Sequence, residues 1–294
     1  MTAEKTFNRW LVVVGALLIQ VSLGAVYIYS VFKPGLSATF PSWSATDLAL
    51  PSQLILAFFA LGVIVAGRIQ DKIGPRLVAS VGGVMLGAGL IIASYADTLT
   101  MFTVAFSVLG GLGIGAAYVC PIATCVKWFP DKRGMITGLA VAGFGAGALV
   151  FTPIAKAFIA SSGIMSTFMY LGIIFLIAVV LGAQLMVVPP AGYKPAGWTP
   201  PAPAPGAASA AGADFTTGEM LKTPQFWFLW ITYFAGCTAG LGGVAHHRRR
   251  SGEHAVGAGE VGADHRVPGL RARLEEPLPG GQLPEQRADR EDVA

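Results

Sequence analysis

The sequence predicts an all-α membrane protein, with a bundle of six helices first, then a seventh helix, then a disordered tail. Seven long apolar stretches separated by short polar breaks lie between Trp10 and about Val244. Hydrophobic residues make up 54% of the chain and charged residues only 12%, which is about half the charge of a typical soluble domain. A mean hydropathy of +0.63 indicates more apolar sequence than a water-soluble fold is able to bury. We therefore expect lipid to surround most of these helices.

Each apolar stretch is long enough to cross a bilayer core, which takes about 20 residues. We expect the helices of the bundle at 10–31, 48–67, 77–95, 100–126, 135–160 and 166–188, and the seventh at 225–244. Ser44 and Asp47 have the spacing of a capping box before the second helix, although Asp replaces the usual Glu or Gln. We expect the first helix to stop before Lys33 and Pro34, because proline does not continue a helix well.

Four segments follow from these patterns. Residues 1–188 form the amino-terminal bundle, 189–224 a Pro/Ala/Gly-rich linker, 225–244 the first helix of a second bundle, and 245–294 the tail. Prolines and small residues throughout 189–224 predict a flexible, partly extended connection. Six helices, a linker and a new helix are typical of a transporter built from two bundles.

Lysine and arginine are unevenly distributed between the predicted loops. They concentrate at the amino end and in the second and fourth loops, at Lys5, Arg9, Arg68, Lys72, Arg76, Lys127, Lys132 and Arg133. Because cytoplasmic loops carry the excess of positive charge, we expect a cytoplasmic amino terminus and a cytoplasmic linker. We expect an integral protein of the bacterial inner (plasma) membrane.

The predicted second loop contains Gly67, then after three residues Asp71 and Lys72, then after one residue Gly74, followed by Arg76. The glycines permit unusual backbone angles, and the Asp71 carboxylate is able to accept hydrogen bonds from a helix N-terminus or an arginine. The spacing resembles the signature loop of the major facilitator superfamily, which implies a conformational latch between two bundles. An ordinary basic turn is the alternative.

A second set of segments resembles the oxalate/formate antiporter family, which is close to the monocarboxylate transporters. These segments are 24–32, 110–121, 127–134 with Asp131, Arg133 and Gly134 in a second cytoplasmic loop, and 223–227. The resemblance covers about residues 8–244. It implies exchange or proton-coupled uptake of small carboxylates by alternating access, with the two bundles rocking about a central site.

Polar side chains inside membrane helices are the default candidates for a substrate pathway. Gln20 and Tyr27 lie seven residues apart, so we expect them on one face of the first helix. The resemblance implies that Tyr27, Gln53 and Tyr118 contribute to the cavity wall, although each tyrosine also fits a packing or interfacial role. Lys156 is a candidate substrate-attracting cation, and snorkelling of its ammonium to the interface is the alternative.

Two glycine pairs four residues apart predict close helix contacts. Gly111 and Gly115, and likewise Gly143 and Gly147, each give a smooth strip on one helix face. Such strips suit both static packing and the sliding that alternating access requires.

The tail from His246 differs in composition from everything before it. It holds all four histidines and eight arginines but no lysine, as out-of-frame translation of a GC-rich gene does. We hypothesise a frameshift near codons 244–246, which fails if neither alternative frame encodes hydrophobic helices. Binding of nucleic acid or anionic lipid by the arginines, or of metal by the histidines, are alternatives that their spacing does not favour.

The resulting functional prediction is transport of small carboxylates, incomplete in this chain, because the family's principal anion-binding residues lie on second-bundle helices. A membrane scaffold or half-transporter that pairs with a second bundle in trans is the alternative. We expect no enzyme activity, no cofactor, no metal site and no nucleic-acid partner. The helices carry no nucleophile–base pair, no paired carboxylates and no metal-ligand spacing.

Overall fold

The computed structural model describes residues 8–190, 192–195, 197–199, 217–236 and 238. The chain divides into two units, Met1–Pro201 and Ala202–Ala294, which are described separately. The described residues form helices and no strand, which confirms the all-α class. The tail at 245–294 and most of the linker at 189–224 lie outside the described residues.

The first unit is built from long apolar helices. Its elements are α1 (Arg9–Leu23), the 3₁₀ segment η1 (Gly24–Ile28), α2 (Tyr29–Thr39), α3 (Ala45–Ile73), α4 (Pro75–Ala93), α5 (Leu99–Thr103), the π-helical segment η2 (Val104–Leu109), α6 (Gly110–Trp128) and α7 (Arg133–Gln184). Five continuous stretches are long and apolar enough to cross a membrane. The longest, α7, is broken at Gly163, whose φ is 79°, so the described part of this unit contains six long apolar helical segments, which we number as crossings.

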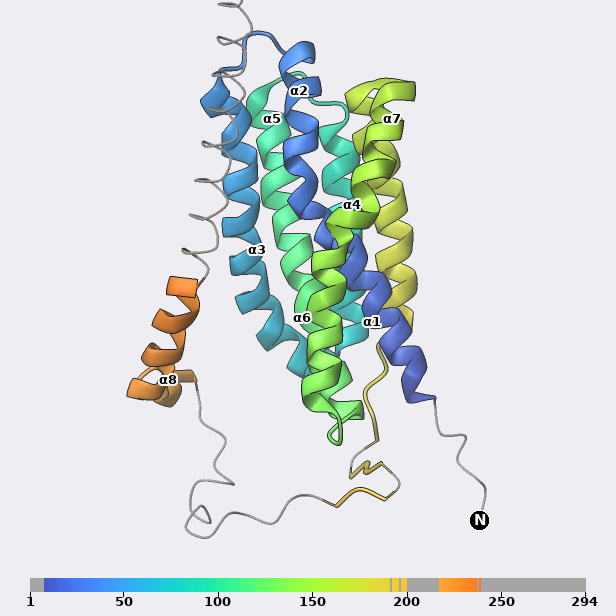
Figure 1. Ribbon diagram of the computed structural model, residues 1–294, viewed down its shortest axis with the longest axis vertical. Coiled ribbons are helices and arrows are strands. Elements are labelled where there is room, and N and C mark those ends of the chain that lie inside the picture. Colours follow the sequence, from blue (N-terminus) through green and yellow to red (C-terminus); the bar gives the residue numbers. More distant parts are fainter. Residues whose placement is uncertain (1–7, 191, 196, 200–216, 237, 239–294) are drawn as a thin grey trace, which may run out of the picture. The chain divides into compact units, whose positions relative to one another are not determined.

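The helices of this unit run side by side along one axis and reverse direction at each turn (Figure 1). One end holds the start of α1, the α3–α4 junction at Gly74 and the turn between α6 and α7. The turns after α2 and after α4 lie at the other end, together with the break at Gly163. The basic residues Lys72 and Lys132 therefore belong to the same end of the bundle.

Large apolar side chains cover the outside of this unit. Leu149 is 81% exposed, and Val14, Ile64 and Leu181 are all more than half exposed. Exposure of this many large apolar side chains indicates contact with lipid or with another protein. The outward-facing residues therefore agree with an integral membrane protein.

Glycines set the closest helix contacts. A Cβ on Gly115 of α6 would overlap the Phe59 carbonyl of α3, and one on Gly147 of α7 would overlap the Val21 carbonyl of α1. Gly111 likewise faces the carbonyl of Ile55 at 2.7 Å from a built Cβ. Both predicted glycine strips thus lie against a neighbouring helix, as close packing in a membrane requires.

Three helix boundaries differ from the sequence prediction. The first crossing does not stop before Lys33 but continues as α2 through Pro34 to Thr39, because membrane helices tolerate an internal proline. The second crossing continues past Gly67 to Ile73. The fifth and sixth crossings are separated by the single left-handed residue Gly163 rather than by a five-residue loop, since glycine reaches positive φ without strain.

Other local predictions hold. Ser44 and Asp47 form the capping box at the start of α3, with the Ser44 backbone N–H donating to the Asp47 carboxylate at 2.9 Å. In the second unit, α8 (Thr217–Met220) is followed by a helix over 224–236. The remainder of the helix predicted at 225–244 lies outside the described residues, apart from Thr238.

Candidate functional site

Four aromatic rings from four different elements meet around Phe144 of α7. The Phe144 ring centroid lies 4.9 Å from that of Tyr118 on α6 and 5.3 Å from that of Tyr27 on η1. Phe59 of α3 completes the group, with its ring 5.2 Å from Tyr118 and 6.1 Å from Phe144. We call Tyr27, Phe59, Tyr118 and Phe144 the aromatic cluster. Both tyrosine rings make edge-to-face contacts with a phenylalanine ring of this cluster.

Gln20 of α1 lies beside the aromatic cluster, on the side that faces the interior of the bundle. Its side chain is fully buried, and its Nε2 lies 3.5 Å from the backbone oxygen of Tyr118, at the outer limit for a hydrogen bond. Its Oε1 has no hydrogen-bond donor among the described residues. A buried acceptor without a donor is destabilising unless a water or ligand supplies one.

A close crossing of α1 and α7 brings the cluster together. Gly24, at the start of η1, lies so near the backbone of Phe144 that any Cβ would overlap its carbonyl. Gly147, one turn further along α7, lies against Gly24 in return. The predicted glycine strip on α7 is thus what allows Phe144 to reach Tyr27.

The prediction that Gln20 and Tyr27 share one face is wrong, because η1 changes the helical phase between them. A 3₁₀ helix advances about 120° per residue against about 100° in an α-helix, so the four residues from Gly24 to Tyr27 add about 80° of rotation. Gln20 points into the bundle, whereas Tyr27 is 56% exposed. Tyr29, two residues further on, is instead buried and donates a 3.0 Å hydrogen bond to the Leu48 carbonyl.

A second feature is a pocket of about 290 Å³ between α2 and α3, next to the aromatic cluster. Gln53 lines it together with Tyr27, so the structure brings these two predicted residues to one pocket. Lys33 lines it as well. Sequence reasoning missed Lys33 because Pro34 was expected to end the helix and leave Lys33 in a loop.

Lys156 does not join the other candidates. Its side chain is exposed on α7, and it lines neither the pocket between α2 and α3 nor the small pocket in the bundle interior. This position agrees with the alternative in which its ammonium reaches the membrane surface.

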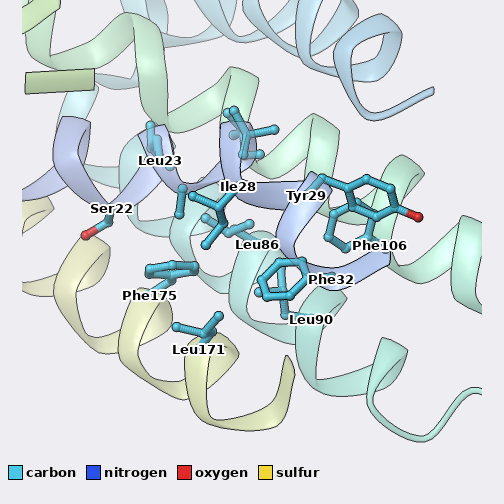
Figure 2. Close-up of a pocket in the computed structure, with 13 residues that line it drawn as sticks. Ser22, Leu23, Ile28, Tyr29, Phe32, Leu86, Leu90, Phe106, Leu171 and Phe175 are labelled. Atoms are coloured by element: carbon cyan, nitrogen blue, oxygen red, sulfur yellow. The ribbon is translucent and has the colours of Figure 1, made fainter. Parts of the chain in front are cut away.

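The bundle interior holds a third feature, a small apolar pocket of about 20 Å³ lined by residues of α1, η1, α2, α4, η2, α6 and α7 (Figure 2). The hydroxyls of Ser22 and Tyr29 point away from its centre and donate to the carbonyls of Leu18 and Leu48. A space of this size holds about one water. It is a packing defect rather than a substrate site.

The predicted latch segment is mostly helix rather than loop. Gly67, Asp71 and Lys72 belong to the last turns of α3, and only Gly74, with φ of 92°, leaves the helical conformation before Pro75 starts α4. The prediction of unusual angles is therefore right for Gly74 and wrong for Gly67. Asp71 is exposed, and its carboxylate makes no hydrogen bond within the described residues.

Arg76 ties this junction to the end of α7. Its Nε donates to Oε1 of Gln184 at 3.0 Å, and the Gln184 amide donates to Ser80 Oγ at 3.3 Å. The contact crosses from the first turn of α4 to the last residue of the sixth crossing. These exposed hydrogen bonds connect the junction to the end of α7 at the surface of the bundle.

The turn between α6 and α7 contains an ion pair. Arg9 at the start of α1 donates to the Asp131 carboxylate at 3.1 Å, and its guanidinium lies 4.5 Å from the Phe129 ring centroid. Arg133 and Gly134 are the first two residues of α7, not loop residues. The predicted second cytoplasmic loop is therefore the short turn 129–132, which is tied to the start of α1.

Comparison of the sequence with known protein families identifies the family of this chain. The profile of the Major Facilitator Superfamily matches residues 7–246. The chain belongs to the major facilitator superfamily. The match covers both crossings that form the latch segment and all elements that form the aromatic cluster.

Three individual transporters are similar to this chain in sequence. The chain is 33% identical over 240 residues to the oxalate:formate antiporter of Oxalobacter formigenes, covering 80% of this chain and 53% of that protein. It is 32% identical over 237 residues to the uncharacterized MFS-type transporter YhjX of Escherichia coli, covering 80% and 56%. It is 31% identical over 191 residues to human monocarboxylate transporter 1, covering 63% and 37%. The chain thus spans about half the length of the first two relatives.

Proposed function

We propose that this major facilitator chain provides the first half of a transport pathway for small carboxylates. The observation that carries the proposal is the aromatic cluster, with Gln20 behind it and the Gln53 pocket beside it. Phenols, an amide and apolar rings suit a small anion that needs a few hydrogen bonds and no bulk water. The names of two relatives, an oxalate:formate antiporter and a monocarboxylate transporter, support the same substrate class.

Transport would proceed by alternating access, with this bundle rocking against a second bundle around a midplane site. Gln20 and Tyr118 are the residues on which we expect substrate to depend most. Asp71, Lys72 and Arg76 would form the latch at the end where α3 meets α4. We place the amino terminus and this end in the cytoplasm of a bacterial cell, because its turns carry the basic residues.

Oxalate counterflow in proteoliposomes tests the proposal. The full chain is reconstituted alone and together with the separately produced second half of the oxalate:formate antiporter. Saturable counterflow of oxalate, formate or lactate in either preparation supports carboxylate transport. A complex that assembles in detergent but carries none of the three would contradict it and favour the scaffold alternative.

A further inference from the structure

We propose that Lys33, Ser30 and Gln53 form a capture site for a small carboxylate at the mouth of the pocket between α2 and α3. The site adjoins the aromatic cluster, because Tyr27 lines the same pocket, and it lies nearer the end of the bundle where α2 stops and α3 begins (Figure 1). The inference rests on the proposed carboxylate function and adds a first binding step to it.

The charge in this pocket is the first argument. Lys33 is half-buried, and in the part of the chain that the structure describes no carboxylate lies within ion-pair distance of its ammonium. Lys33 Nζ instead lies 5.9 Å from the ring centroid of Tyr29, within the range of a cation–π contact. A partly desolvated cation without a counter-ion favours binding of an anion.

The neighbouring donors are the second argument. Ser30 precedes Lys33 by three residues, so the two share a face of α2, and Gln53 lines the opposite wall on α3. Neither the Ser30 hydroxyl nor the Gln53 amide has a hydrogen-bond partner within the described residues. One carboxylate group is therefore able to accept from a hydroxyl and an amide while its charge faces the ammonium.

The structure also explains why Lys33 is held in this place. Tyr29 fixes the first turn of α2, because its hydroxyl donates to the Leu48 carbonyl of α3 at 3.0 Å. α2 then continues through Pro34, which keeps Lys33 in helical register with Tyr29 and Ser30. The pocket volume of about 290 Å³ far exceeds the space that one water needs, which leaves room for formate, lactate or oxalate.

Protection of Lys33 from an amine-reactive reagent tests the site on the purified full chain. Labelling by a water-soluble succinimidyl ester is followed at each lysine by mass spectrometry, with rising sodium oxalate or formate at constant ionic strength. We expect either carboxylate to slow labelling of Lys33 and to leave Lys156 unchanged. Lys156 is the matched control, since it is also a membrane-helix lysine but lies outside the pocket.

Two variants test the donors. Gln53→Leu should raise the half-protecting oxalate concentration by about tenfold, the loss expected for one hydrogen bond to a charged group. Ser30→Ala should also raise it, whereas Ser37→Ala, on the same helix but outside the pocket, should not. Equal protection of Lys33 and Lys156, equal protection by chloride or sulfate, or no effect of Gln53→Leu would overturn the site.

The readout separates this inference from the proposed function, because labelling reports binding and counterflow reports transport. Protection of Lys33 without counterflow would leave the capture site standing and contradict transport. Counterflow without protection of Lys33 would overturn the capture site and leave transport standing.

Discussion

The indole nitrogen of Trp128 donates a 2.6 Å hydrogen bond to the backbone oxygen of Val187. Trp128 is the last residue of α6, and Val187 follows the end of α7. The Trp128 ring also packs edge-on against Tyr193 at 4.8 Å. The start of the segment that leaves the bundle is thereby held against the fourth crossing.

Trp128→Phe should release this segment, because phenylalanine fills much of the space but donates no hydrogen bond. We expect about 1 kcal/mol of stability to be lost and faster chymotryptic cleavage after Tyr193. Thermal unfolding in detergent and timed proteolysis measure the two effects. Trp10→Phe is the control, since Trp10 is half-exposed and packs on Phe129; equal cleavage in both variants would contradict the role of Trp128.

The crossing of α1 and α7 predicts a contrast between two glycines on one helix. Gly147→Ala would overlap Val21 and Gly24, whereas Gly145 has open space at its Cβ position. We expect Gly147→Ala to cost about 1–3 kcal/mol and Gly145→Ala to stabilise the helix by about 0.5–1 kcal/mol. Melting temperatures in one detergent measure both changes, and a Gly147→Ala protein as stable as the parent would refute the crossing.

The Arg9–Asp131 pair should contribute modestly to stability. Its side chains are 25% and 17% exposed, so solvent screens part of the attraction, and exposed pairs are worth about 0.2–1 kcal/mol. Asp131→Asn and Arg9→Gln should each destabilise the bundle by about this amount, and less at high salt. A double-mutant cycle with a coupling of zero would show that the pair does not tie α1 to the turn.

Substitution of Gln20 should affect stability and carboxylate transport in opposite ways. Gln20→Met keeps the side-chain length and removes the buried Oε1 that lacks a donor. We therefore expect the free energy of unfolding to stay constant or to rise by about 1 kcal/mol, while carboxylate counterflow falls. Lower stability with unchanged counterflow would make Gln20 a packing residue instead.

Much of the bundle follows from the sequence, because apolar length, caps and glycine spacing act locally. The six crossings, the Ser44 cap and the glycine strips are of this kind. The phase change at η1, which separates Gln20 from Tyr27, does not follow from spacing, because it depends on how closely Gly24 approaches Phe144. The position of Lys33 could not be predicted either, since it depends on Pro34 being tolerated within a membrane helix.

The account depends most on a bundle that crosses lipid with both basic turns on one side, and cysteine accessibility measures this directly. Single cysteines are introduced as Lys72→Cys, Lys132→Cys, Thr98→Cys and Ser161→Cys in a Cys237→Ser background, where Cys120 and Cys125 are buried. A membrane-impermeant maleimide should label positions 72 and 132 from the cytoplasmic side, and 98 and 161 from the opposite side. Labelling of 72 and 132 from opposite sides would contradict the account.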